Sequence, residues 1–144
     1  MLRSALSGLG LGLAVAAMIG SGAASAQSAA RIFRVGYIVV ASPEEQAHLT
    51  RAFEDGMRDL GYVDGRDVAY ERRFAHGDTG RLPDLAAELV KLAPDVIVTG
   101  GNPVIAAVRR TATTIPVVMG ISRDPVGAGF VASYGRPGGN VTGL

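Results

Sequence analysis

The sequence predicts an α/β fold, a doubly wound parallel sheet with helices on both of its faces. Short runs of β-branched residues alternate along the chain with longer segments of helical periodicity. Each of these longer segments is long enough to cross from one parallel strand to the next. With the first strand in the centre of the sheet, the natural strand order is the flavodoxin-like order 2-1-3-4-5.

The predicted strands differ in how apolar they are. Residues 34–40 are almost continuously apolar, which is typical of a strand buried on both faces. Residues 67–74 alternate between apolar and polar side chains, and this pattern predicts an edge strand with Arg72 and Arg73 in solvent. Residues 96–99 and 115–119 are predicted as the third and fourth strands, and residues 140–144 begin another extended piece.

The predicted helices carry boundary signals. Ser42, Pro43 and Glu45 form the capping-box start of a first helix, and Gly61 is its expected C-terminal glycine. Leucines at positions 82, 85, 89 and 92 line a second helix, which must end before Pro94. A turn at 100–103 leads into a third helix over 104–111, and residues 122–125 open either a short fourth helix or a turn.

The first 26 residues have the three parts of a secretory signal peptide. Arg3 supplies the positive start, an apolar run covers residues 5–19, and Ala24, Ser25 and Ala26 form a small-x-small cleavage site. The apolar run is shorter than the roughly 20 residues that span a bilayer. We therefore expect cleavage after Ala26 and a periplasmic or secreted domain over residues 27–144. Because the chain has no cysteine, it cannot carry the thioether lipid of a lipoprotein or any disulfide.

The composition excludes several functions. The chain has 14 Lys+Arg against 13 Asp+Glu, and this near-neutral balance argues against a nucleic-acid partner. Two histidines and no cysteine give no metal-ligand spacing, and no Gly-rich phosphate or dinucleotide motif follows the first strand. Residues 120–124 match a nucleophile elbow only in part, because Asp124 stands where the second glycine belongs. The sequence therefore predicts no enzyme activity, no cofactor and no metal.

Cap–proline pairs occur three times, just after the first, third and fourth predicted strands. Ends of neighbouring parallel strands meet at one edge of a sheet, where open α/β sheets bind ligands. Free N–H groups and the positive ends of helix dipoles favour an anion there, and a carboxylate is the obvious candidate. The alternative is that each proline only starts a helix and each glycine only makes a tight turn. The candidate ligand-binding residues are Ser42, Gly100, Gly101, Asn102, Ser122 and Asp124.

Longer stretches of the sequence carry a family resemblance. The stretches are 52–62 (AFEDGMRDLGY), 80–90 (GRLPDLAAELV), 94–101 (PDVIVTGG), 113–118 (TTIPVV), 124–126 (DPV) and 136–143 (RPGGNVTG). With these, the chain resembles the bacterial ABC-transporter substrate-binding proteins of the tryptophan and aromatic-amino-acid type. The resemblance spans nearly all of residues 34–144.

The resemblance implies a two-lobed periplasmic binding protein that closes on a solute between its lobes. It implies that residues 27–144 are the first lobe, truncated before the second, and that the solute contacts Ser42, Gly101, Asn102 and the turn at 122–124. The expected partners are a small carboxylate-bearing solute, perhaps an amino acid, and an ABC permease in the inner membrane. The sequence leaves two alternatives open, a ligand-sensing input domain for a receptor or kinase and an exported enzyme.

Overall fold

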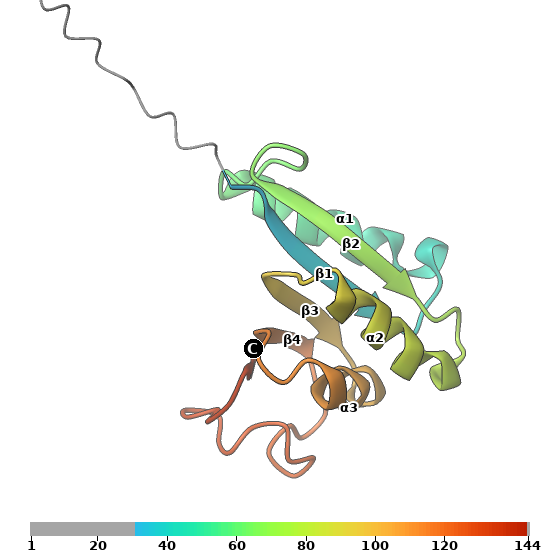
Figure 1. Cartoon of the computed structure of the whole chain (residues 1–144), viewed down its shortest axis with the longest axis vertical. Coiled ribbons are helices and arrows are strands. Elements are labelled where there is room, and N and C mark those ends of the chain that lie inside the picture. Colours follow the sequence, from blue (N-terminus) through green and yellow to red (C-terminus); the bar gives the residue numbers. More distant parts are fainter. Residues whose placement is uncertain (1–30, 144) are drawn as a thin grey trace, which may run out of the picture.

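The computed structural model describes residues 31–143, so the predicted signal peptide lies outside the described residues (Figure 1). Strands and helices alternate along the chain as the sequence predicts. In chain order the elements are β1 (Phe33–Val39), α1 (Pro43–Asp59), β2 (Val68–Phe74), the short 3-10 helix η1 (Thr79–Arg81), α2 (Leu82–Lys91), β3 (Val96–Gly100), α3 (Asn102–Thr111), β4 (Val117–Ile121) and β5 (Val141–Gly143).

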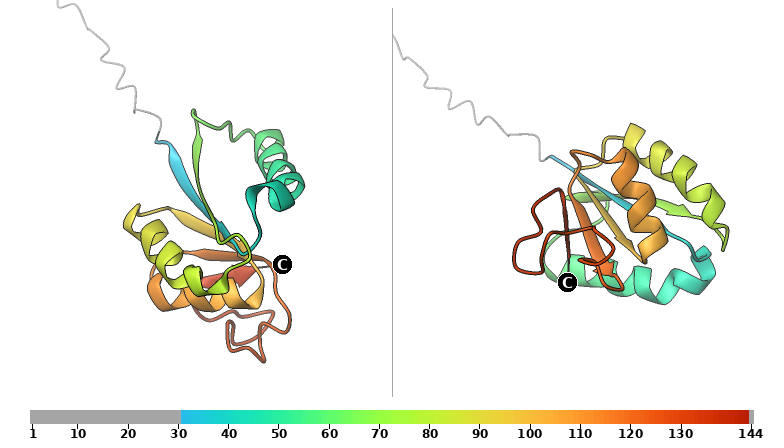
Figure 2. Two further views of the ribbon diagram at one scale, coloured as in Figure 1. Left: turned by 90° about the vertical axis from the view of Figure 1, so that its right-hand side faces the viewer. Right: turned by 90° about the horizontal axis from the view of Figure 1, so that it is seen from below.

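The five strands form one parallel sheet in the order β2-β1-β3-β4-β5, which confirms the predicted order. Strand β1 is central: it pairs with β2 from Phe33 opposite Val68 onward, and with β3 from Val35 opposite Val96 onward. Helices α2 and α3 cover one face of the sheet, and α1 lies on the other face (Figure 2). This arrangement follows from right-handed crossovers, because only the β1–α1–β2 crossover moves toward the β2 edge.

The hydrophobic core lies between the sheet and the helix pair α2–α3. Leu89 is completely buried there, and the leucine stripe that predicts α2 faces inward as expected. Helix α2 approaches the central strand closely at Gly36, where an added Cβ atom would lie 3.0 Å from Leu89 Cδ2. The other main contributors to this core are Ile38, Leu82, Leu85, Ile97, Val104, Ile105, Val108 and Val117.

Helix α1 is held by an aromatic cluster rather than by a buried core, because none of its residues is fully buried. The Phe53 ring stacks on Tyr37 with centroids 6.4 Å apart and meets the edge of Tyr70 at 6.0 Å. Arg72 pairs with Glu54 of α1, so it is not the free solvated side chain that the strand pattern predicts. The cluster anchors α1 over β1 and β2 only.

Backbone chemistry corrects one sequence prediction and decides between two alternatives at another position. Strand β4 begins at Val117, two residues later than predicted, because Pro116 has no N–H to donate to the ladder. After Ser122 the chain forms a turn, which is one of the two alternatives that the sequence leaves open. Asp124 has a positive φ of 47°, and its Oδ1 accepts a hydrogen bond from Gly127 N at 2.8 Å. Its side chain therefore caps a turn.

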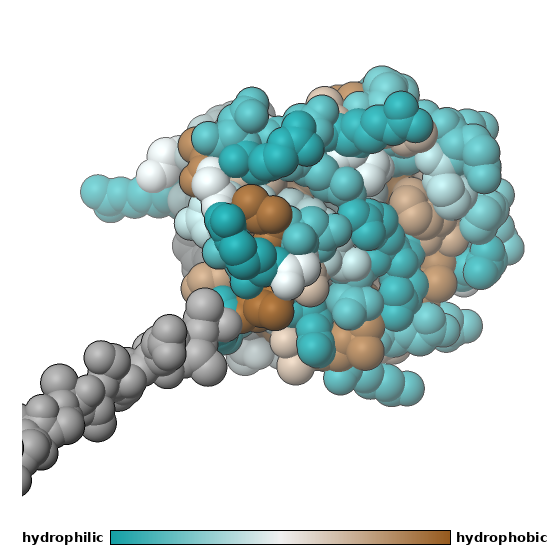
Figure 3. All heavy atoms as spheres, turned by 90° about the horizontal axis from the view of Figure 1, so that it is seen from above, coloured by the Kyte–Doolittle hydropathy of each residue, from teal (hydrophilic) through white to brown (hydrophobic). Residues whose placement is uncertain are grey.

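The end of the molecule shown in Figure 3 is mostly hydrophilic, with separate hydrophobic patches between the polar side chains. Single exposed apolar residues of this kind are normal on a domain surface. No helix within residues 31–143 has the length and hydrophobicity needed to cross a bilayer.

The hydroxyl of Tyr70 predicts a loss of stability at alkaline pH. Burial raises the pKa of Tyr70, and the negative charges of Glu54 and Asp64 raise it further. The folded pKa of Tyr70 then exceeds the unfolded value of 10.0. The contribution of the neutral Tyr70 side chain to folding stability is therefore complete below about pH 10, and it is lost as pH rises through the folded pKa.

We expect the Tyr70→Phe protein to lose less stability than the wild type between pH 9 and pH 11, as measured by urea unfolding. Phenylalanine also removes a hydroxyl that is buried without a hydrogen-bond partner in the described residues. The control is Tyr134→Phe, since Tyr134 is 77% exposed. Equal pH dependence of the wild type and Tyr70→Phe would contradict the prediction.

Candidate functional site

The ends of β1, β3 and β4 lie side by side, because these strands are parallel neighbours in the sheet. We call residues 40–42, 100–102 and 122–124 the strand-end rim. It contains every ligand-binding residue that the sequence predicts. The loop after β2 reaches the same edge, since Gly77 N donates to Val40 O at 2.8 Å. The predicted geometric arrangement is therefore present, and the hydrogen bonds decide which of its polar groups are free.

Ser42 caps the N-terminus of its own helix, α1. Its hydroxyl accepts a hydrogen bond from Glu45 N at 3.3 Å, and Glu45 Oε2 accepts one from Ser42 N at 2.9 Å, so the predicted capping box is formed. Hydrogen bonds from its own backbone N–H and from Ser42 lower the pKa of Glu44, and the charge of His76 lowers it further. Two carboxylates thus occupy the start of α1, which makes this part of the rim unfavourable for a solute anion.

The start of α3 is open. Its N-cap is Gly101, not Asn102, and no side chain caps it. Gly101 has a φ of +86°, a conformation that suits glycine, and its N–H donates to Ile121 O at 2.9 Å. Pro103 has no N–H, and Val104 N donates to Gly101 O at 3.1 Å, so the N–H of Asn102 is the group at this start that has no acceptor within residues 31–143. The helix dipole makes this end positive. Among the predicted helix starts, this one keeps the character of an anion site.

Asn102 joins two of the loops of the rim. Its Nδ2 donates to Arg123 O at 2.8 Å, while its Oδ1 accepts from Arg123 N and from Ser122 Oγ, both at 3.0 Å. The side chain therefore holds the loop after β4 against the start of α3. Its role in the structure is to position its neighbours, and the hydroxyl of Ser122 is occupied by the same contact.

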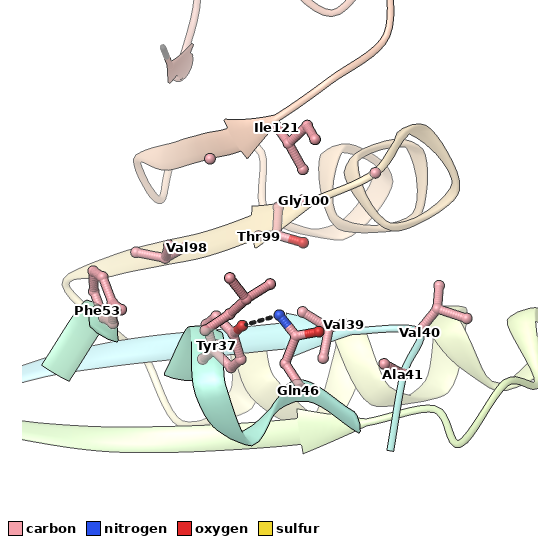
Figure 4. A pocket seen from close by; sticks show the side chains of 13 residues that line it. Tyr37, Val39, Val40, Ala41, Gln46, Phe53, Val98, Thr99, Gly100 and Ile121 are labelled. Atoms are coloured by element: carbon pink, nitrogen blue, oxygen red, sulfur yellow. Dashed lines mark hydrogen bonds between the residues drawn. The ribbon is translucent and has the colours of Figure 1, made fainter. Parts of the chain in front are cut away.

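An apolar groove of about 620 Å³ opens between α1 and the sheet (Figure 4). Phe53 and Tyr37 lie along one side of it, and Ile121 lies across from them. Tyr37 is buried as the sequence predicts, and its hydroxyl accepts a hydrogen bond from Gln46 Nε2 at 2.8 Å. Thr99 also lines the groove, but its hydroxyl is already bonded to Ile38 O at 2.7 Å. The groove therefore offers mainly apolar surface.

A second hollow of about 410 Å³ lies at the start of α3. It shares Gly101 and Ile121 with the groove, so the two hollows meet at the rim. The remaining lining residues are Asn102, Pro103, Ser122 and Arg123. Together the hollows offer an apolar surface next to a positively polarised helix start, which can hold a small molecule with an apolar part and an anionic part. Within residues 31–143, no group of three or more acidic or histidine side chains is placed to hold a metal.

The sequence prediction missed the groove. Leu49 and Phe53 of α1 line it, and the bare surface beside them depends on how far α1 extends over the sheet. The signal that could have found it is the strand order itself. With right-handed crossovers, the helices after β2 and β3 pack on the opposite face and leave β3 and β4 uncovered on the α1 side.

The fold and this rim define a periplasmic-binding-protein type of domain. A conserved domain protein from Vibrio cholerae has the same fold, with a TM-score of 0.73 and 29% identity over 79% of this chain and 38% of that chain. An ABC domain from Streptococcus pneumoniae, in complex with L-Trp, gives a TM-score of 0.72 and 26% identity over the same shares of the two chains.

The chain belongs to the ABC transporter substrate binding protein family, whose sequence profile matches residues 34–144. It is also similar to a tyrosine-binding protein of Clostridioides difficile, with 32% identity over 93 residues. That match covers 65% of this chain and 27% of the relative. The chain thus spans less than half the length of the relatives it matches. The family is one of solute-binding proteins and not of enzymes.

Proposed function

We propose that this chain is the first lobe of the solute-binding component of an ABC importer. Its strand-end rim would hold the carboxylate end of a small solute such as an amino acid. The observation that carries this proposal is the meeting of the two hollows at Gly101 and Ile121. An amino acid combines a carboxylate for the start of α3 with a side chain for the apolar groove.

The relatives support an amino acid as the solute class, because one is described as tyrosine-binding and another was solved with L-Trp. The proposal includes export after cleavage at Ala26, action outside the cytoplasmic membrane and delivery of the solute to a permease. It includes no chemistry on the solute. Because the matched relatives are longer, the second wall of the cleft would come from a lobe that residues 31–143 do not contain.

Ligand-observed saturation-transfer NMR of the purified chain with a panel of amino acids tests the proposal. A single lobe covers only part of a ligand, so we expect weak binding, with a Kd on the order of 1 mM. Amino acids with large apolar side chains should receive magnetisation, and neutral sugars of similar size should not. The absence of transfer to every amino acid from a folded chain would contradict the proposed solute class.

A further inference from the structure

Arg123 differs from most other arginines of the described chain, because its guanidinium contacts no carboxylate or carbonyl within residues 31–143. Six of the other eleven arginines in residues 31–143 form an ion pair with a nearby acid, whereas Arg51, Arg110 and Arg136 form none. Ion pairs of this kind involve Arg31, Arg34, Arg58, Arg66, Arg72 and Arg73. The guanidinium of Arg109 also has a partner, since it donates a hydrogen bond to Gly129 O. Arg123 therefore carries a free positive charge, and it lines the hollow at the start of α3.

The backbone of Arg123 is fixed from both sides. Asn102 accepts a hydrogen bond from Arg123 N at 3.0 Å and donates one to Arg123 O at 2.8 Å. The adjacent carboxylate of Asp124 forms no ion pair with Arg123 in the described residues, and its Oδ1 accepts from Gly127 N at 2.8 Å. The loop that carries Arg123 is thus anchored next to the positive end of a helix, and Arg123 lines the hollow there.

We propose that Arg123 is the residue that binds the carboxylate of the solute, and that Asn102 positions it. This inference rests on the proposed function and names the charged contact of that same site. A guanidinium presents paired N–H donors that match the two oxygens of a carboxylate, and such charge-assisted bonds are stronger than neutral ones. The helix start of α3 then adds to the attraction, while the acids at the start of α1 keep the carboxylate away from that end of the rim.

The test is a fluorescence titration with L-tryptophan and L-tryptophanamide, which lacks the carboxylate. The chain contains no tryptophan, so indole emission reports the ligand alone. We expect the wild type to bind L-tryptophan about tenfold more tightly than the amide, as a charge-assisted hydrogen bond predicts. Arg123→Gln should lose this preference by weakening L-tryptophan binding alone, and Arg123→Lys should keep part of it.

Arg110→Gln is the matched control, because Arg110 lies in the last turn of α3, at the far end of the helix from the rim. It removes the same charge from the protein and should leave both affinities unchanged. If Arg123→Gln keeps the wild-type preference for the carboxylate, the assignment of Arg123 is wrong while the proposed function stands. If the wild type binds neither compound and no amino acid of the panel, the proposed function itself fails.

Discussion

Replacing Asn102 by alanine is expected to weaken L-tryptophan binding about tenfold. The change removes three hydrogen bonds that tie Ser122 and Arg123 to the start of α3. Without them the loop after β4 samples more conformations, and the solute must order it again on binding. Freezing a few side chains and a short loop costs free energy on the order of 1 kcal/mol, which is close to tenfold in affinity. The measurement is the same fluorescence titration.

Asn140 provides a matched control for this variant. Its side chain also joins two segments of backbone, because its Nδ2 donates to Ala112 O and Ile115 O, but this contact lies at the opposite edge of the sheet, where β5 begins. Asn140→Ala should therefore lower the free energy of unfolding about as much as Asn102→Ala does, by about 1–2 kcal/mol, without weakening solute binding. Equal losses of affinity in the two variants would show that Asn102 acts through general stability and not through the rim.

Replacing Leu89 by alanine is expected to lower the free energy of unfolding by about 3 kcal/mol. Leu89 is fully buried in the core, and it packs against the central strand at the position where Gly36 leaves room for it. A small domain has a total stability of roughly 5–15 kcal/mol, so this single truncation removes a large part of it. Urea unfolding followed by circular dichroism measures the loss.

Leu60→Ala is the comparison for this second variant, because Leu60 is a leucine that is 75% exposed at the end of α1. Its unfolding free energy should stay within about 0.5 kcal/mol of the wild type. A cost below 1 kcal/mol for Leu89→Ala would mean that α2 does not seal the core as the structure describes.

The fold was predictable because its signals are local. Apolar strands, the capping box at Ser42 and the leucine stripe of α2 are each contained within a short segment, and crossover handedness then fixes the order of the strands. The errors arose where local and tertiary effects compete. Strand β4 extends to Ile121 because it pairs with Gly100 across a register shift in β3. At Asp124 the sequence leaves a helix and a turn open, and the turn forms because the carboxylate accepts a hydrogen bond from Gly127 N.

The candidate site was predictable in its location but not in its chemistry. Parallel topology is enough to bring the loops after β1, β3 and β4 to one edge. The sequence cannot show that the Ser42 hydroxyl is hydrogen-bonded to Glu45, or that the Asn102 side chain is hydrogen-bonded to the loop after β4. Hydrogen-bond partners of this kind depend on the folded geometry. For the same reason the sequence selected the turn at 122–124 without identifying Arg123 as its free charge.

The most direct test of the central claim is a map of amide chemical shifts in the ¹⁵N-labelled chain during titration with L-tryptophan. We predict that the largest changes fall on residues 100–102 and 120–123, with smaller changes along the groove at Leu49 and Phe53. Changes concentrated instead at the opposite edge of the sheet, around Asp67, Asp95 and Asn140, would show that the strand-end rim does not bind the solute.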